Sequence, residues 1–491
     1  MNKAIIVGSG IAGIASSIRL AKKGYLVKVF EANSFPGGKI HSFEKSGYRF
    51  DGGPSLFTMP QFVDELFELC GENPKDHFSY TKKEIACNYF WEDGKKLVAY
   101  GNKQDFINEV HEKLGVPKKK LINYFDRSKK KYDLTAPIFL EKSLHKLKTF
   151  ISKETVNAMF HLGKYDIFKS LHELNKETLE EPHLIQLFDR FATYNGSNPY
   201  KTSGMMSVIN HLEQHYGTFL PKKGMVSIAR SLVELAKRQG VEFVYNTCVD
   251  EIVVKNNKVL GVKSERHFYS SDVVISNMDI NPTYNLLLKN EIKPNKILNS
   301  EPSSSAVIFY WGISRKFKEL DLHNIFFSDN YSAEFDSIFN QNKVYEDPTL
   351  YINITSKDIP KDAPKNSENW FVMINTPPDK GQDWNSIVKQ IRKNVEKKIS
   401  RNLGVDISKY IEAEEVLTPE IIQQKTQSHL GSLYGPSSND RLSAFFRHPN
   451  FSSKIKSLFF CGGSVHPGGG IPLCLLSAKI TTDLIKKNMR C

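Results

Sequence analysis

The chain has 491 residues, 40% hydrophobic and 11% aromatic, a composition that suits two or three globular domains and excludes a disordered chain. Mean hydropathy is −0.39, and no apolar run reaches the roughly 18 residues of a membrane span, so we expect neither a transmembrane helix nor a signal peptide. The net charge of +13 comes without a zinc-finger, basic-zipper or RNA-binding motif, which favours an anionic membrane surface over nucleic acid as a partner.

The first predicted elements are a buried strand over residues 4–7 and an amphipathic helix over residues 14–23. Between them Gly8, Gly10 and Gly13, with Ala12, form a Gly-x-Gly-x-x-Gly turn. In such a turn the first glycine allows a tight bend, the second a close approach to a pyrophosphate, and the third close packing of helix on strand. The helix then presents free N–H groups to the phosphates. The turn predicts a dinucleotide site.

A second strand over residues 26–30 ends at Glu31, which lies 18 residues after Gly13. An acid at this place can accept hydrogen bonds from ribose hydroxyls. Residues 35–39 (Phe-Pro-Gly-Gly-Lys) and 49–56 follow, the latter containing Ser55 and Leu56. Here the sequence resembles the flavin amine oxidase and carotenoid desaturase superfamily, which implies FAD. That superfamily usually has arginine where this chain has Lys39, and lysine neutralises a phosphate only as a point charge.

From residue 223 the pattern of a nucleotide-binding domain returns. We expect a helix after Gly224, strands over residues 241–244, 247–254 and 272–277, and a hairpin turn at Asn256–Asn257. Apolar strands over residues 306–311 and 370–374 alternate with polar loops, which indicates a mixed sheet that forms a substrate domain.

The C-terminal stretch carries a second glycine-rich turn. A strand over residues 457–461 leads into Gly-Gly-Ser-Val-His-Pro-Gly-Gly-Gly over residues 462–470, and a helix begins at Ile471–Pro472. A helix N-terminus aimed at the flavin pyrimidine edge would stabilise negative charge on the reduced ring. Two such turns at opposite ends of the chain indicate one large cofactor held by both.

The predicted fold is α/β: a Rossmann-like FAD-binding domain, a mixed-sheet substrate domain and a helical region that is a candidate for membrane association. We expect the FAD-binding domain to be discontinuous and to consist of residues 1–75, 223–285 and 440–491. The substrate domain is expected over residues 76–115 and 286–439, and the helical, basic region over residues 116–222.

With both ends considered, the chain resembles the bacterial phytoene desaturase family of carotenoid desaturases over essentially its full length. The resemblance rests on residues 198–200, 220–225, 276–279 and 466–472. It implies that Val249 pairs through its backbone with adenine and that Asn277, Ser55 and Leu56 lie near the cofactor. It also implies that Gly463 and Ile471 lie near the flavin, and we add Leu433 and Gly470 as cofactor-binding candidates.

Two segments indicate the branch of the family. Residues 187–196 (Leu-Phe-Asp-Arg-Phe-Ala-Thr-Tyr-Asn-Gly) and 431–435 (Gly-Ser-Leu-Tyr-Gly) are similar to hydroxycarotenoid 3,4-desaturases. The resemblance implies a lipophilic carotenoid substrate with a 1-hydroxylated acyclic end group, monocyclic substrates such as 1′-hydroxy-γ-carotene included. Either segment can equally consist of packed helix and turn residues.

The chemistry expected is removal of a hydride and a proton from adjacent carbons, with the flavin as hydride acceptor. Resonance in a polyene stabilises the developing cation, so a strong protein base is unnecessary. Asp189, Arg190 and His466 are candidates for a base, but a buried Asp–Arg pair is more often structural and His466 can simply stabilise its turn; we assign no catalytic base. Oxygen or a quinone is the expected electron acceptor.

Residues 117–153 form a candidate membrane contact, because they are rich in lysine and place Leu140, Leu144, Leu147 and Ile151 at helical spacing. The alternative is a solvated helix whose apolar stripe packs on the core. The six cysteines form no Cys-x-x-Cys pair, so we expect no disulfide framework, no metal site and a reducing, cytoplasmic location. Together with the basic segment, this predicts a cytoplasmic protein that is peripherally bound to the cell membrane.

Other functions stay open at this point. A phytoene- or lycopene-type desaturase would act on an unhydroxylated polyene, and a carotene isomerase would use FAD without net oxidation. An amine oxidase of the same superfamily needs an aromatic pair around the flavin and often a covalent cysteine. GDP-dissociation inhibitors share the fold but bind prenylated partners without catalysis.

Overall fold

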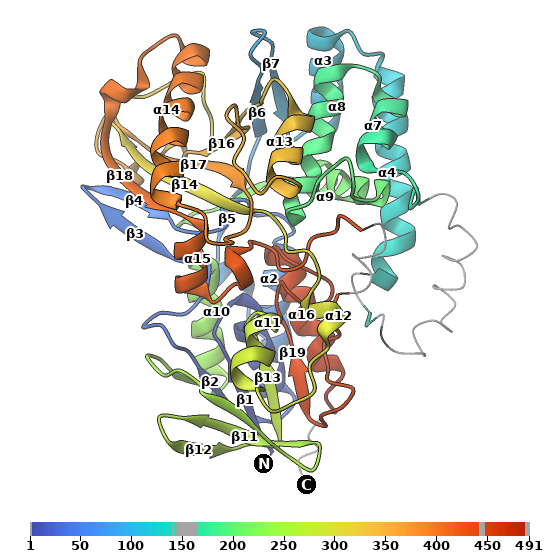
Figure 1. The fold of residues 1–491 in the computed structure, drawn as a ribbon, viewed down its shortest axis with the longest axis vertical. Coiled ribbons are helices and arrows are strands. Elements are labelled where there is room, and N and C mark those ends of the chain that lie inside the picture. The colour runs from blue at the N-terminus through green and yellow to red at the C-terminus, as the bar shows by residue number, and fades with distance from the viewer. Residues whose placement is uncertain (1, 140–141, 144, 146–164, 441–446, 487–491) are drawn as a thin grey trace.

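The computed structural model describes residues 2–139, 142–143, 145, 165–440 and 447–486. Two bodies are stacked along the long axis of the molecule (Figure 1). The lower body is built on a parallel sheet, and the upper body combines a larger mixed sheet with a group of helices beside it. Both bodies draw on early and late parts of the chain, so neither is one continuous segment. The exact domain boundaries given above stay predictions.

The lower sheet has five parallel strands in the order β19-β13-β1-β2-β9. Its strands are β1 (Lys3–Val7), β2 (Leu26–Phe30), β9 (Glu242–Val244), β13 (Val273–Ser276) and β19 (Leu458–Phe460). Side chains alternate across this sheet, so Ala4 and Ile6 face one core while Ile5 and Val7 face another. Strands covered on both faces read as continuous apolar runs, which is why they were predictable.

Helices cover one face of the lower sheet: α1 (Ile11–Lys22), α2 (Gln61–Cys70), α10 (Val226–Arg238) and α16 (Ile471–Asp483). The other face packs against a three-stranded antiparallel sheet of β10 (Glu251–Lys255), β11 (Lys258–Ser264) and β12 (His267–Ser270). The expected turn at Asn256–Asn257 joins β10 to β11, with both residues at positive φ, and is confirmed.

Two expected boundaries were wrong. Helix α1 begins at Ile11, directly after the glycine turn, instead of at residue 14. The strand expected over residues 247–254 is formed only from Glu251 onward. Residues 247–250 leave the sheet because Thr247 donates its N–H to the carbonyl of Glu31 (2.9 Å), and all four residues line a cavity instead. A tertiary partner therefore overrides the β propensity of this stretch.

The upper sheet has seven strands in the order β18-β14-β17-β16-β15-β6-β7. It is mixed, as predicted, because β15 and β6 are parallel while the other neighbours are antiparallel. Its strands are β6 (Ile85–Phe90), β7 (Lys96–Tyr100), β14 (Ser305–Ile313), β15 (His323–Phe326), β16 (Leu350–Asn353), β17 (Glu368–Thr376) and β18 (Ile411–Leu417). One face packs through Trp311 and Trp370 against α14 (Trp384–Leu403), and the other faces the lower body.

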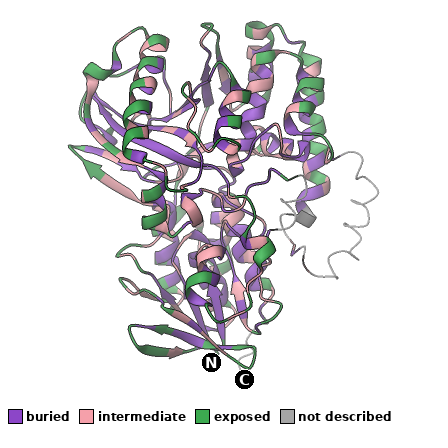
Figure 2. Cartoon of the chain, in the orientation of Figure 1, coloured by how far each residue is buried: buried purple, intermediate pink, exposed green. Residues whose placement is uncertain are grey.

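Two small pairings connect the bodies. The hairpin of β3 (Ser42–Lys45) and β4 (Tyr48–Asp51) packs on the cavity side of the upper sheet. Strand β5 (Tyr80–Lys82) pairs with β8 (Phe219–Pro221). The interior of both bodies is buried, and exposed residues lie on the outer helix faces and loops (Figure 2).

The helical group beside the upper sheet has its own apolar core. Its helices are α3 (Lys103–Leu114), α4 (Lys118–Phe139), α7 (Leu171–Leu179), α8 (Pro182–Asp189), α9 (Val208–Tyr216) and α13 (Tyr331–Phe339). The described residues also form the α-helices α11 (Ile280–Pro282), α12 (Asn295–Leu298) and α15 (Pro419–Thr426).

The basic segment expected at the membrane is only partly covered by this structure. Leu140, Leu144, Leu147, Ile151, Lys146, Lys148 and Lys153 lie outside the described residues. On α4, Lys118, Lys119 and Lys130 are exposed, but Lys131 is 2% exposed and pairs with Asp166, so it does not belong to the surface patch. Within the described residues, no helix has the length and apolar character to cross a bilayer.

Candidate cofactor and substrate cavity

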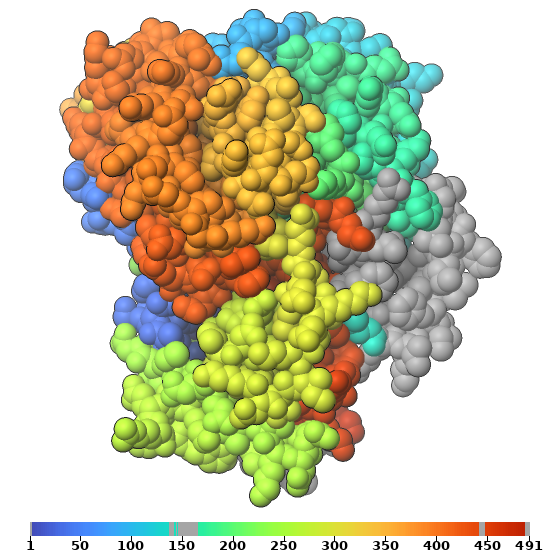
Figure 3. Space-filling view, in the orientation of Figure 1, coloured from blue at the N-terminus to red at the C-terminus, as the bar shows by residue number. Residues whose placement is uncertain are grey.

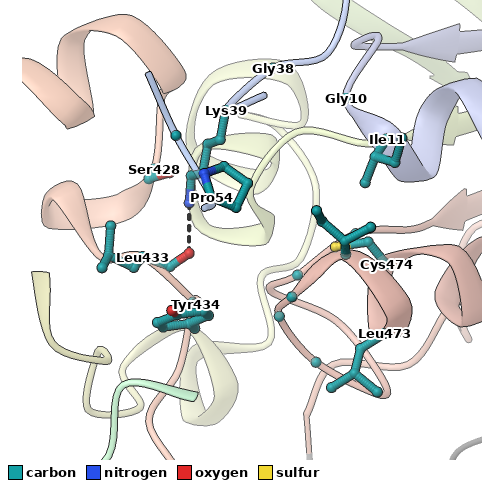
Figure 4. A pocket seen from close by; sticks show the side chains of 18 of the residues that line it. Gly10, Ile11, Gly38, Lys39, Pro54, Ser428, Leu433, Tyr434, Leu473 and Cys474 are labelled. Carbon is teal, nitrogen blue, oxygen red and sulfur yellow. Dashed lines mark hydrogen bonds between the residues drawn. The ribbon is translucent and has the colours of Figure 1, made fainter. Parts of the chain in front are cut away.

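A cavity of about 1020 Å³ lies where the two bodies meet. Its walls come from the glycine turns near both ends of the chain, the cavity side of the upper sheet, and the helical group. In the space-filling view, segments far apart in sequence lie side by side across this waist (Figure 3). Figure 4 shows the part of the cavity bounded by Gly10, Lys39, Leu433 and Cys474.

The side chain of Asn277 is one reason why the turn after β1 contains glycines. A Cβ built on Gly10 would lie 2.6 Å from Asn277 Oδ1, and one on Gly13 would lie 2.9 Å from the same atom and 2.3 Å from the carbonyl of Gly8. Asn277 in turn donates through Nδ2 to the carbonyl of Cys461 (3.1 Å), which precedes the second glycine turn. Asn277 therefore connects the two turns that the sequence predicted.

Glu31 is buried and held by four donors. Its carboxylate accepts from the N–H (2.8 Å) and hydroxyl (2.7 Å) of Ser9 and from the N–H and Nδ2 of Asn33, both at 2.9 Å. These bonds fix the carboxylate at the end of β2, where it lines the cavity. The expected position at the carboxyl end of the strand is the one observed.

The side chain of Lys39 is held by hydrogen bonds to the protein. Its Nζ donates to the carbonyls of Leu433 (2.8 Å) and Ser432 (3.3 Å), as the dashed line in Figure 4 marks for Leu433. Burial lowers the pKa of Lys39, and the nearby carboxyl of Asp279 opposes this effect. The lysine thus ties the first glycine segment to the 431–435 segment while remaining part of the cavity wall.

Two helix N-termini without side-chain caps border the cavity. Helix α1 begins after Gly10 and α16 after Gly470, and neither N-cap residue supplies a hydrogen-bonding side chain. Their first-turn N–H groups, apart from Pro472 of α16, which has none, are therefore available to an anionic or electron-rich ligand. Position 470 favours glycine because its φ is +102°, a backbone conformation that residues with a side chain rarely adopt.

Thirteen of the fourteen predicted cofactor-binding residues line this one cavity: Gly8, Gly10, Ala12, Glu31, Lys39, Ser55, Leu56, Val249, Asn277, Leu433, Gly463, Gly470 and Ile471. The exception is Gly13, which lies beneath the turn, packed on Gly8 and Asn277. What each residue contacts when a cofactor is bound stays a prediction.

Sequence reasoning missed several polar residues of the cavity. Arg447 is 3% exposed, and its Nη1 donates to the carbonyls of Tyr434 (3.0 Å) and Gly463 (3.2 Å). Burial lowers the pKa of this guanidinium to about 10. No carboxylate pairs with it within the described parts of the chain. An isolated buried cation beside a cavity favours an anionic ligand there.

A second missed group lies on the upper sheet. The hydroxyl of Tyr351 bonds Ser55 Oγ (2.9 Å) and His323 Nδ1 (2.8 Å), and burial lowers the pKa of His323 to about 3. Tyr351 and His323 stand beside apolar residues and one asparagine in each of their strands, so no local pattern marks them as cavity residues.

The suspected Asp189–Arg190 pair is wrong. Asp189 accepts from Asn175 Nδ2 (2.8 Å) and bonds His172 Nδ1 (2.6 Å), while Arg190 Nη2 donates to Tyr89 Oη (2.9 Å). Adjacent residues on a helix point in different directions, so the two side chains reach different partners. His466 does not line the cavity; its Nε2 bonds the carbonyl of Lys142 (3.0 Å).

These features fit a flavin dinucleotide. A glycine turn opens an uncapped helix, a fixed carboxylate ends the next strand, and a second uncapped helix borders the same cavity. Two bodies that meet around such a cavity define a flavoprotein oxidoreductase.

The comparisons agree. Residues 11–486 match the family model described as flavin containing amine oxidoreductase. The chain is 53% identical over 485 residues, 99% of each chain, to a 1-hydroxycarotenoid 3,4-desaturase of Flavobacterium sp. (strain P99-3). It is 30% identical over 499 residues, again 99% of each, to a 4,4′-diapolycopene oxygenase of Methylomonas sp.. An oxidoreductase structure from Methanosarcina mazei superposes with a TM-score of 0.63 at 15% identity, covering 98% of this chain and 100% of that one.

The chain belongs to the flavin-containing amine oxidoreductase family. The predictions of an α/β fold, of FAD as cofactor and of an oxidoreductase are confirmed. The non-enzymatic alternative is set aside.

Proposed function

We propose that this protein is an FAD-dependent desaturase that introduces a C=C bond at C3,4 of a carotenoid with a 1-hydroxylated acyclic end group. The observation that carries the proposal is the 53% identity, over 99% of both chains, to a 1-hydroxycarotenoid 3,4-desaturase. The diapolycopene oxygenase relative is 30% identical over the same extent, which favours desaturation over oxygenation.

The cavity supports this assignment chemically. Apolar residues of the upper sheet, among them Ile308, Phe371 and Met373, line it and would hold a polyene away from water. The bound flavin supplies the hydride acceptor for such a reaction. The chain's part is to bind and orient the polyene, and we assign no residue as the proton acceptor.

We assign the cofactor contacts as predicted. The N-terminus of α1, with Gly10 and Ala12, would hold the pyrophosphate, Glu31 the ribose, and Val249 the adenine. Gly463, Gly470 and Ile471 would lie at the flavin. Their joint presence around one cavity supports the assignment.

To test the proposal, the purified protein is incubated with hydroxylated and with unhydroxylated acyclic carotenoids. The masses of the products are then measured. Each desaturation removes two hydrogens, an isomerisation leaves the mass unchanged, and an oxygenation adds oxygen. We expect the hydroxylated substrate to lose two hydrogens. Conversion of phytoene or lycopene but not of the hydroxylated substrate would overturn the proposal. Repeating the assay without oxygen, with and without a quinone, identifies the electron acceptor.

We also propose that the protein binds the cytoplasmic face of the cell membrane peripherally, since its substrate dissolves in lipid. Exposed Lys118, Lys119 and Lys130 on α4 support this, because lysines near an anionic bilayer attract it. The five cysteines of the described residues are free thiols, which suits a reducing compartment.

Charge reversal tests the membrane contact. Replacing Lys142, Lys146 and Lys148 with glutamate should weaken sedimentation with anionic liposomes. The matched control reverses three exposed lysines of α14, Lys389, Lys393 and Lys397, which lies on the opposite side of the upper body (Figure 1). Equal binding by both triple variants would reject the lysines of residues 142–148 as the contact.

A further inference from the structure

Tyr434 lies where the two segments that resemble hydroxycarotenoid desaturases meet the C-terminal glycine turn. A Cβ on Gly196, the last residue of the 187–196 segment, would lie 2.9 Å from Cδ2 of the Tyr434 ring. A Cβ on Gly469, in the C-terminal turn, would lie 2.9 Å from Cδ1. The ring therefore packs directly on the backbone of two glycines, and any larger residue at either position would displace it.

The backbone of Tyr434 is fixed as well. Its N–H donates to Ser303 Oγ (3.0 Å), and its carbonyl accepts from Arg447 Nη1 (3.0 Å). The next residue accepts from the N–H of Ser303 through the carbonyl of Gly435 (2.8 Å). Ring and backbone together hold the side chain in one position, as a group that selects a ligand requires.

The phenol group of Tyr434 lies at the cavity and is free to bond a ligand. Tyr434 lines the cavity, and Figure 4 shows it beside Leu433 and across from Leu473 and Cys474. Its side chain keeps partial exposure, and its hydroxyl has no hydrogen-bond partner within the described residues. Burial raises the pKa of Tyr434 to about 12, so the phenol stays neutral and can both donate and accept.

The position suits one feature of the proposed substrate. Three bonds separate the oxygen of a 1-hydroxyl group from C3, so a group that binds this oxygen lies within about 7 Å of the reacting bond. The reacting bond must face the flavin, and the ring of Tyr434 touches the glycine turn that we expect beside the flavin. A donor placed at the far end of the cavity would be too distant.

We propose that Tyr434 is a specificity-determining residue that hydrogen-bonds the hydroxyl group of the substrate's end group through its phenol. This inference rests on the proposed function and deepens it, because it names how a hydroxylated end group is told from an unhydroxylated one. A site built to bond a hydroxyl discriminates against an analogue that lacks it.

The experiment compares Tyr434→Phe with the wild type on two carotenoids that differ only in the 1-hydroxyl. The variant keeps the ring that packs on Gly196 and Gly469 and removes only the oxygen. We expect kcat/KM for the hydroxylated carotenoid to fall about 10- to 100-fold, and that for the unhydroxylated one to stay within about twofold. Tyr345→Phe, outside the cavity, is the matched control. Flavin content and melting temperature show that each variant folds.

The outcomes separate the inference from the proposed function. A wild type that converts the hydroxylated carotenoid, with a variant that slows both substrates equally or neither, overturns the inference alone. A wild type that converts neither substrate overturns the proposed function. In that case equilibrium binding to the flavin-loaded protein decides: tighter binding of the hydroxylated carotenoid that Tyr434→Phe abolishes supports the inference, and equal binding overturns it.

Discussion

Among single residues, Asn277 explains most about the cofactor end of the cavity. Would-be Cβ atoms on Gly10, Gly13 and Gly462 all fall within 3 Å of its amide, at 2.6, 2.9 and 2.8 Å. Its backbone N–H donates to the carbonyl of Val7 (2.8 Å), so it joins β1, β13 and the chain after β19. The glycines of a dinucleotide fingerprint are therefore required here by protein packing as well as by a pyrophosphate.

Gly13→Ala tests this packing. The added methyl would lie 2.3 Å from the carbonyl of Gly8, a backbone atom that cannot move aside without shifting the turn. We expect a loss of about 1–3 kcal/mol in the free energy of unfolding and a clear fall in bound flavin. Urea unfolding and the ratio of flavin to protein absorbance measure both.

Lys22→Ala is the matched control, since it also places alanine in α1 but on its exposed face. It should change the free energy of unfolding by less than about 0.5 kcal/mol and leave the flavin content unchanged. If Gly13→Ala behaved like this control, Asn277 and Gly8 would not constrain the turn.

Between elements, Asp189 joins two helices of the group beside the upper sheet. It lies at the end of α8 and bonds His172 and Asn175, both on α7. Burial raises the pKa of Asp189, and its bonds to His172 and Asn175 oppose this. The residues that follow, among them Arg190 and Tyr194, line the cavity, so this contact sets where the cavity wall begins.

Asp189→Ala should destabilise the protein by about 3 kcal/mol, because it leaves the buried Asn175 and the partly buried His172 without their acceptor. Asp189→Asn keeps the shape and one acceptor oxygen and should cost less. The midpoint of urea unfolding gives the values. Glu177→Ala removes a surface ion pair with Lys169 from the same helix α7 and should cost under about 1 kcal/mol. An equal effect of Asp189→Ala and Glu177→Ala would contradict a role for Asp189 in joining the helices.

The elements show what the sequence can predict. Strands β1, β2, β13 and β19 and both glycine turns are local patterns of apolar residues and glycine, and they lie where expected. Residues 247–250 and Lys131 were misjudged because their partners, Glu31 and Asp166, are far away in the sequence. His323, Tyr351 and Arg447 enter the cavity through the pairing and stacking of distant segments, which no local pattern encodes.

For the whole molecule, the burial of histidine side chains makes the free energy of unfolding depend on pH. Burial lowers the pKa values of His211, His448 and His466 to about 4 and that of His323 to about 3. In the unfolded chain these rings take up protons near pH 6.5. Between pH 6.5 and about 4 the unfolded state therefore binds more protons than the folded state. The stability that comes from burying neutral rings is complete above pH 6.5 and declines as the pH falls through this window.

His448→Gln isolates one of these four contributions. His448 donates from Nδ1 to the carbonyl of Pro449 (2.7 Å), and in the neutral ring its Nε2 accepts from Tyr284 Oη (3.2 Å). The wild type should lose up to about 1.4 kcal/mol more per pH unit than the variant between pH 6.5 and 4.5, because glutamine takes up no proton. Urea unfolding at several pH values in this range measures the two slopes, and buried carboxyls that shift in the opposite sense cancel in the difference. His267→Gln, on the surface, is the matched control. Parallel curves for the wild type and His448→Gln would mean that burial of the neutral His448 ring does not contribute to the loss of stability at acidic pH.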